Sequence, residues 1–230
     1  MIVIHEIVRL QDALTRRWHG QPEGDSEPAR SVAEGELQCD EKTREEWLHL
    51  VEEQHRANFD LWHIEDEARR PGASDAQLAS VKRRIDRTNQ MRNDLVEELD
   101  RMLLKWLAGR GLPNAKAPLH SETPGSMIDR LSILSLKIFH TREEVEREHA
   151  PEGHAGRNRE RLAILEKQRR DLAGCLVDLW KEVLSGARRF ELYQQMKMYN
   201  DPALNPAIYG QSETRSGGKT PSRDAPIDGR

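Results

Sequence analysis

Apolar residues recur at helical spacing through most of the chain. This pattern predicts one short amphipathic helix followed by four long helices. The predicted spans are about 2–18, 41–70, 74–108, 126–148 and 157–186. Ser74 or Asp75 is a suitable N-cap for the 74–108 helix, and Gly109 follows its end. The fold class is therefore all-α, and we expect an antiparallel four-helix bundle.

The stretches between and after these helices indicate how the chain is organised. Residues after the first helix are rich in Gly, Pro, Ser and charge, and the last residues have almost nothing to bury. We expect an N-terminal amphipathic helix (1–19), a flexible linker (20–40), a helical bundle domain (41–210) and a disordered tail (211–230). The bundle domain ends in a helical and extended segment over 187–210, which could cover one end of the bundle or meet a partner.

Two of the predicted helices carry an arginine within an apolar heptad stripe. In the second long helix Leu78, Ile85, Arg92, Leu99 and Trp106 are spaced seven apart, and in the fourth Arg169 takes the corresponding place among leucines. A shift of 77 residues superposes "NQMRNDLVEEL" on "EKQRRDLAGCL" and Arg92 on Arg169. We interpret the chain as two helical hairpins related by duplication, although heptad helices also resemble one another by chance.

A guanidinium in a bundle core needs carboxylates or a water-filled cavity around it. We expect a buried polar layer around Arg92 and Arg169, with Asp66 and Asp129 as counter-ions. The layer either fixes helix register or lines a ligand cavity. Its candidate ligand-binding residues are His55, Asn58, Trp62, Glu65, Asp66, Arg69, Asn89, Arg92, Asn93, Ser126, Asp129, Arg130 and Arg169.

The sequence patterns for catalysis, metal binding and phosphate binding are weaker. His63 and Asp66 are candidates for a general base and its orienting partner. The spacings of Glu52 with His55 and of His63 with Asp66 suit metal ligands, but arginines in the same layer disfavour a dication, and we expect no bound metal. Ser126 is read as the cap of the third long helix, with Asp129 as its capping-box partner. The same helix start could instead hold a phosphate.

Composition and charge limit the classes of partner and the cellular location that we expect for this chain. One third of the residues are charged, the net charge is −4, and no basic block suggests nucleic-acid binding. The chain has no apolar run long enough for a membrane span, and its first residues do not resemble a signal peptide, so we expect a cytoplasmic protein. Cys175 is expected to be a small buried residue. A homodimer is left open.

Four strings closely resemble one bacterial family, a domain of unknown function. They are "HRANFDLWHIEDEARR", "VKRRIDRTNQMRND", "APLHSETPGSMIDRLSILSLKI" and "QQMKMYNDPALNPAIYG", and they cover about 50–210. The family usually has Asn where this chain has His120. The resemblance brings no established activity or cofactor. Members tend to be encoded beside glycosyltransferases of the lipopolysaccharide heptosyltransferase type, which implies a glycosyltransferase partner or a sugar-phosphate ligand.

These features are consistent with three alternative functions. The first is a helical binding or accessory protein with a site for an anionic ligand, such as a sugar phosphate or nucleotide sugar, in cell-surface glycan synthesis. The second is a metal-assisted phosphohydrolase or transferase acting on such a compound. The third is an interaction module whose polar layer is purely structural.

Overall fold

The computed structural model describes residues 4–21, 41–196 and 204. The regular elements of this part are α1 (Ile4–Trp18), α2 (Glu41–Ala68), α3 (Asp75–Ala108), α4 (Pro124–Glu146) and α5 (His154–Leu184). The all-α prediction is confirmed. The expected linker after residue 21 and the tail from 211 lie outside the described residues, as does 197–210 apart from residue 204.

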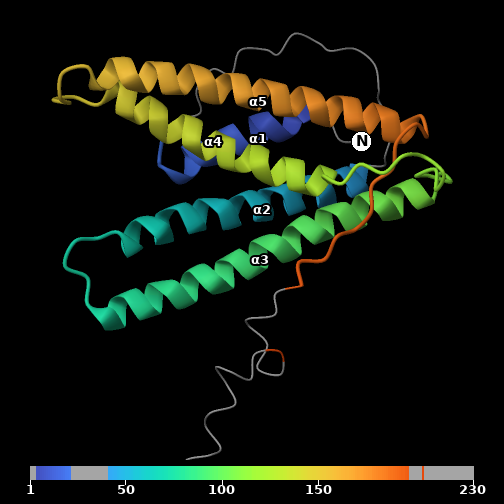
Figure 1. Cartoon of the computed structure of the whole chain (residues 1–230), viewed down its shortest axis with the longest axis horizontal. Coiled ribbons are helices and arrows are strands. Elements are labelled where there is room, and N and C mark those ends of the chain that lie inside the picture. Colours follow the sequence, from blue (N-terminus) through green and yellow to red (C-terminus); the bar gives the residue numbers. More distant parts are fainter. Residues whose placement is uncertain (1–3, 22–40, 197–203, 205–230) are drawn as a thin grey trace, which may run out of the picture. The chain divides into compact units, whose positions relative to one another are not determined.

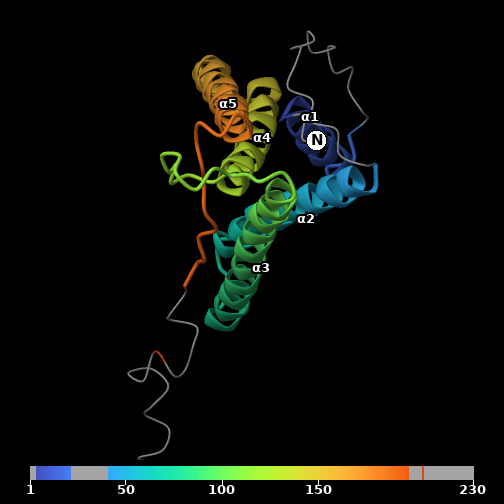
Figure 2. The same ribbon diagram turned by 90° about the vertical axis from the view of Figure 1, so that its right-hand side faces the viewer.

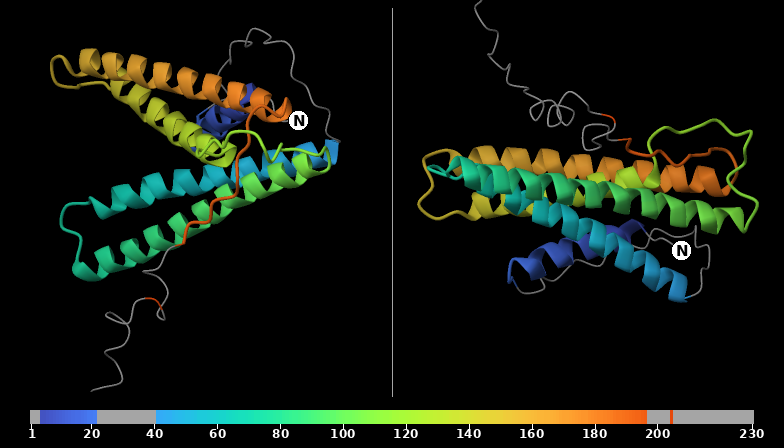
Figure 3. Two further views of the ribbon diagram at one scale, coloured as in Figure 1. Left: turned by 45° about the vertical axis from the view of Figure 1, so that its right-hand side comes forward. Right: turned by 90° about the horizontal axis from the view of Figure 1, so that it is seen from below.

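The long helices form two antiparallel hairpins, α2 with α3 and α4 with α5 (Figures 1 and 3). The hairpins approach each other near the α3–α4 connection and separate toward their own turns. Helix α1 packs on α4, α2 and α5 (Figure 2). Its residues Ile4 and Ile7 belong to the same hydrophobic core as Leu99 of α3 and Leu176 of α5. The origin of the hairpins in a duplication stays a prediction.

The core side chains of α3 differ in part from the predicted heptad stripe. Leu99 is fully buried as expected, but Leu103 and Leu107 continue the buried stripe, while Trp106 is only partly buried. Leu78, near the α2–α3 turn, is 39% exposed. That turn lies away from the α4–α5 hairpin (Figure 1), so few neighbours are there to bury an apolar side chain.

One of the two predicted helix caps is confirmed and the other is corrected. Ser74 caps α3 in a capping box with Gln77. Helix α4 is capped by Thr123, with Pro124 at its first position, so the prediction of a Ser126 cap was wrong. The Gly125 N–H donates to Asp100 Oδ1 at 2.7 Å. This helix start therefore already binds a carboxylate from α3, in the place considered for a phosphate.

The described residues after α5 return along the α3–α4 connection. The Arg189 N–H donates to the Pro118 carbonyl at 3.1 Å, and the His120 N–H donates to the Arg189 carbonyl at 2.7 Å. Phe190 is 1% exposed and packs into the core. The beginning of the 187–210 segment thus contributes to the core. Across the described part of the chain, no helix is both long and apolar enough to cross a membrane.

Candidate functional site

A buried hydrogen-bond network joins α1, α2 and α4 around His55. His55 Nε2 lies 2.9 Å from Thr15 Oγ1, whose hydroxyl proton is donated to the Gln11 carbonyl at 2.8 Å. Thr15 therefore accepts from His55 Nε2–H, and His55 Nδ1 accepts from the Ser132 hydroxyl at 2.7 Å. Burial lowers the pKa of His55 to about 3. A neutral, fully buried imidazole with both nitrogens occupied holds helices together and is not placed to act as a base.

Asp129 is the acidic centre of the network. Its Oδ1 accepts hydrogen bonds from Gln54 Nε2 at 2.6 Å and from Asn58 Nδ2 at 2.9 Å. Arg92 Nε lies 3.4 Å from the same oxygen, so Asp129 is the counter-ion of Arg92 that the sequence predicted. Burial raises the pKa of Asp129, against the lowering effects of Arg92 and the two amides.

A cleft of about 570 Å³ lies beside this network, between α2, α3 and α4. Its volume is in the range of small-molecule sites. It contains seven residues that the sequence analysis selected: Asn58, Trp62, Glu65, Asp66, Arg69, Asn89 and Arg92. Apolar side chains of all three helices complete its lining, namely Leu61, Ile85, Ile133 and Leu136. Helical spacing on α2 and α3 therefore identified most of the polar lining.

The charges at the cleft are unevenly paired. Arg69 contacts Glu65 at 3.3 Å and Asp66 at 3.5 Å, all within α2. Asp66 is therefore paired with Arg69, and the prediction that it is a counter-ion of the polar layer was wrong. Arg92 approaches Asp129 through Nε, which is buried and has no hydrogen-bond partner among the described residues.

Arg169 lies in a second polar contact, separate from Arg92. Its Nη1 is 2.7 and 2.8 Å from the two carboxylate oxygens of Asp12, and Ser135 also donates to Asp12. The expectation of one layer containing both arginines was thus wrong. Asp12 was not among the predicted residues because it is on α1, outside the predicted bundle domain 41–210.

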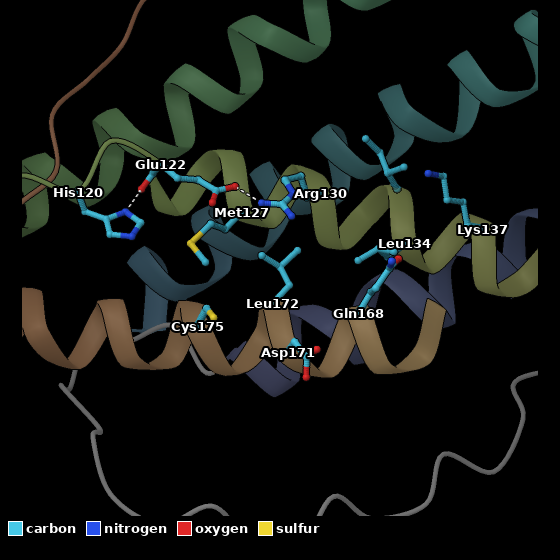
Figure 4. Close-up of a pocket in the computed structure, with 11 residues that line it drawn as sticks. His120, Glu122, Met127, Arg130, Leu134, Lys137, Gln168, Asp171, Leu172 and Cys175 are labelled. Carbon is cyan, nitrogen blue, oxygen red and sulfur yellow. Dashed lines mark hydrogen bonds and ion pairs between the residues drawn. The ribbon is translucent and has the colours of Figure 1, made fainter. Parts of the chain in front are cut away.

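A second cleft, of about 660 Å³, lies between α4 and α5 (Figure 4). Arg130 is in this cleft and pairs with Glu122, whose carbonyl oxygen is 2.7 Å from His120 Nδ1. Cys175 also lines it and is exposed, so the prediction of a buried thiol was wrong. Two further candidates line neither cleft: Asn93 is buried on α3, and the Ser126 hydroxyl accepts from Thr123.

The match to known sequences covers the helices that form both clefts. The family model described as "Protein of unknown function (DUF4254)" matches residues 48–192. The chain belongs to this family. The searches of curated proteins and of solved structures gave no match. The DUF4254 segment includes all polar residues of the α2–α3–α4 cleft, whereas Gln11, Thr15 and Asp12 precede it.

His63, the candidate base, does not line the α2–α3–α4 cleft and instead contacts other rings. Its ring centroid is 4.5 Å from that of Phe59, 5.2 Å from that of His19 and 6.0 Å from that of His140. Burial is the main cause that lowers the pKa of His63, and the neighbouring histidines lower it further. No local pattern pointed to His19 or His140, because the three rings come from α2, α4 and the residue that follows α1.

Proposed function

We propose that the α2–α3–α4 cleft binds an anionic sugar derivative, a sugar phosphate or a nucleotide sugar, and that the protein is a binding or accessory module. The observation that carries this proposal is Arg92. Its guanidinium enters a cleft of ligand size, and no hydrogen bond joins it to another residue of the described chain. A partly buried guanidinium with free N–H groups is suited to a phosphate.

The rest of the lining supports a sugar attached to that phosphate. The amides of Asn58 and Asn89 and the carboxylates of Glu65 and Asp66 are groups that hydrogen-bond hydroxyls. Trp62 supplies an aromatic surface for a ring, and its own position is fixed by stacking on His140 at 4.6 Å with an interplanar angle of 9°. Arg69 donates hydrogen bonds to both carboxylates, Glu65 and Asp66, whereas Arg92 has an ion pair with Asp129 but no hydrogen bond among the described residues, so Arg92 is the proposed anion-binding group.

The biological setting proposed is cell-surface glycan synthesis, with a glycosyltransferase of the heptosyltransferase type as partner. This setting rests on the gene neighbourhood expected from the family resemblance.

We also propose that the two hairpins arose by duplication within a four-helix bundle. The support for this is the sequence register, in which a shift of 77 residues superposes Arg92 on Arg169.

The test is a thermal-shift panel of sugar phosphates, nucleotide sugars, nucleotides and inorganic phosphate against the full chain. Arg92→Met removes the guanidinium and keeps a side chain of similar length. Arg87→Met, an exposed position on the same helix, is the matched control. We expect one compound class to raise the Tm of the wild type and of Arg87→Met but not of Arg92→Met.

Two results would support the alternative functions. Turnover of a bound compound, lost in His63→Ala or Asp66→Asn, would support the hydrolase or transferase alternative. If no compound shifts the Tm, and Arg92→Met differs from the wild type only in stability, the polar layer is structural and the binding proposal is wrong.

A further inference from the structure

A cluster of three histidines lies at the meeting point of three elements, outside the proposed sugar site. His19 follows the last residue of α1, His63 is on α2 and His140 is on α4. One nitrogen from each ring lies within 4.8 Å of the others. The ring planes are tilted at 58° to 81° to one another, so the rings converge without stacking.

The hydrogen bonds of two of these rings fix which nitrogen carries the proton. His19 Nδ1 is 2.8 Å from the carbonyl oxygen of Thr15, which can only accept, so Nδ1 is protonated and Nε2 has a lone pair. His140 Nδ1 is 2.9 Å from Glu143 Oε2, and the same reasoning leaves a lone pair on its Nε2. Both Nε2 atoms are buried and have no hydrogen-bond partner among the described residues.

Packing alone does not account for two buried acceptors without donors, because each forgoes a hydrogen bond to water. A metal ion does account for them. Histidines that bind metals generally donate their other ring N–H to a carbonyl or a carboxylate, which holds the ring in the ligating orientation. Thr15 and Glu143 take these two places here.

The surroundings of His63 and His140 favour the neutral imidazole that metal ligation requires. Burial lowers the pKa of His63 and of His140, and charge repulsion from neighbouring histidines lowers it further. Aromatic rings border the cluster, with Phe139 stacked on His19 at 4.3 Å and Phe59 edge-on to His63 at 4.5 Å.

We propose that His19, His63 and His140 bind one divalent first-row transition ion of the zinc class. Imidazole is a good ligand for Zn²⁺, Cu²⁺ and Ni²⁺, and it is a poor one for Mg²⁺ or Ca²⁺. Zinc–nitrogen bonds of about 2.0–2.1 Å in tetrahedral geometry place ligand nitrogens about 3.4 Å apart, a closure that side-chain rotation can supply. Three protein ligands leave a fourth position for water or another donor.

This ion would join α1 to the family segment. His19 precedes the matched residues 48–192, whereas His63 and His140 are within them. Since His140 stacks on Trp62, the ion would also hold one wall of the sugar cleft. The metal proposal does not depend on the sugar proposal, because its test uses the metal alone.

The test is titration of the chelator-treated, tag-free full chain with Co²⁺ and with Zn²⁺. Co²⁺ binding is followed by visible absorption and Zn²⁺ binding by calorimetry. His63→Phe and His19→Phe keep an aromatic ring and remove the ligand nitrogen. His49→Gln, at an exposed position on α2, is the control, and circular dichroism checks that each variant is folded.

We expect one ion per chain in the wild type and in His49→Gln, with cobalt absorption of the intense tetrahedral kind. His63→Phe and His19→Phe should each lose saturable binding. Glu143→Gln, which changes only the partner of His140 Nδ1, should weaken binding by about tenfold. No saturable binding in the wild type, or equal binding in wild type and in whichever of the two histidine variants folds, would overturn the proposal.

Discussion

Arg92 Nε lies 3.4 Å from Asp129 Oδ1, and the same carboxylate oxygen accepts hydrogen bonds from Gln54 and Asn58. Asp129 therefore has three partners from two helices, whereas Arg92 has one. This asymmetry distinguishes the roles of the two charges. The carboxylate is part of the core network, and the guanidinium is available to the cleft.

The asymmetry predicts unequal costs for removing either charge. Asp129→Ala leaves the buried Gln54 amide and the Arg92 guanidinium without their acceptor and removes one of two acceptors of Asn58, so we expect a loss of about 3 kcal/mol or more in the free energy of unfolding. Arg92→Met leaves the Asp129 carboxylate with both amide donors and keeps most of the packing, so we expect a smaller loss of about 1–2 kcal/mol. Urea denaturation compares the two. Equal losses would mean that Arg92 is as structural as Asp129.

Asp12 and Arg169 are predicted to hold α1 on the α4–α5 hairpin. Their side chains are 23% and 16% exposed, so water screens the pair only in part. Asp12→Asn should lower the free energy of unfolding by about 2–3 kcal/mol. A double-mutant cycle with Arg169→Met isolates the coupling, since removal of both groups should cost less than the sum of the single changes. Strict additivity would contradict the pairing.

His55 predicts how stability depends on pH. Its pKa is about 3 in the folded chain and about 6.5 when unfolded, so the unfolded chain takes up the proton first as the pH falls. The contribution of His55 is present above the unfolded pKa and is lost on acidification, by about 2 kcal/mol between pH 7 and pH 5. Burial raises the pKa of Asp100 to about 6, which has the opposite sign, so wild type and variant must be compared.

The variant His55→Gln should therefore lose less stability than the wild type over that pH interval. Guanidinium denaturation at pH 7, 6 and 5 measures the difference. Parallel pH dependence in the two proteins would show that His55 is not the group responsible.

Gly125 permits the close approach of α4 to α3. A Cβ at this position would lie 2.7 Å from the Val96 carbonyl oxygen and 2.9 Å from the Asp100 carboxyl carbon. Gly125→Ala should therefore destabilise the fold by about 2 kcal/mol or more. Gly174→Ala is the matched control, because nothing lies within 4 Å of a Cβ there, and it should stabilise α5 by about 0.5–1 kcal/mol. Thermal unfolding of both variants gives the comparison.

The sequence predicted local features better than tertiary ones. Helical spacing, Ser74 and the residues that line the cleft on α2 were readable because each depends on neighbours three or four positions away. The start of α4 was misjudged because the helix begins at Pro124, two residues before the predicted cap Ser126, and proline is favoured at the first position of a helix.

What the sequence could not supply is the set of contacts made by α1. Thr15 bonds to His55, Asp12 pairs with Arg169, and His19 meets two histidines of other helices. None of these pairs has a spacing that periodicity can detect. The separation of Arg92 from Arg169 has the same origin, since α1 supplies the carboxylate for one and α4 supplies it for the other.

The most direct test of the sugar-phosphate site is calorimetric titration of a hexose 1-phosphate or heptose phosphate into the wild type, Arg92→Met and Arg87→Met at low and moderate salt. We predict saturable binding to the wild type and to Arg87→Met, weakened by salt, and at least about tenfold weaker binding to Arg92→Met. Binding of equal strength to all three proteins, or no binding to any of them, would contradict the assignment of the cleft as a sugar-phosphate site.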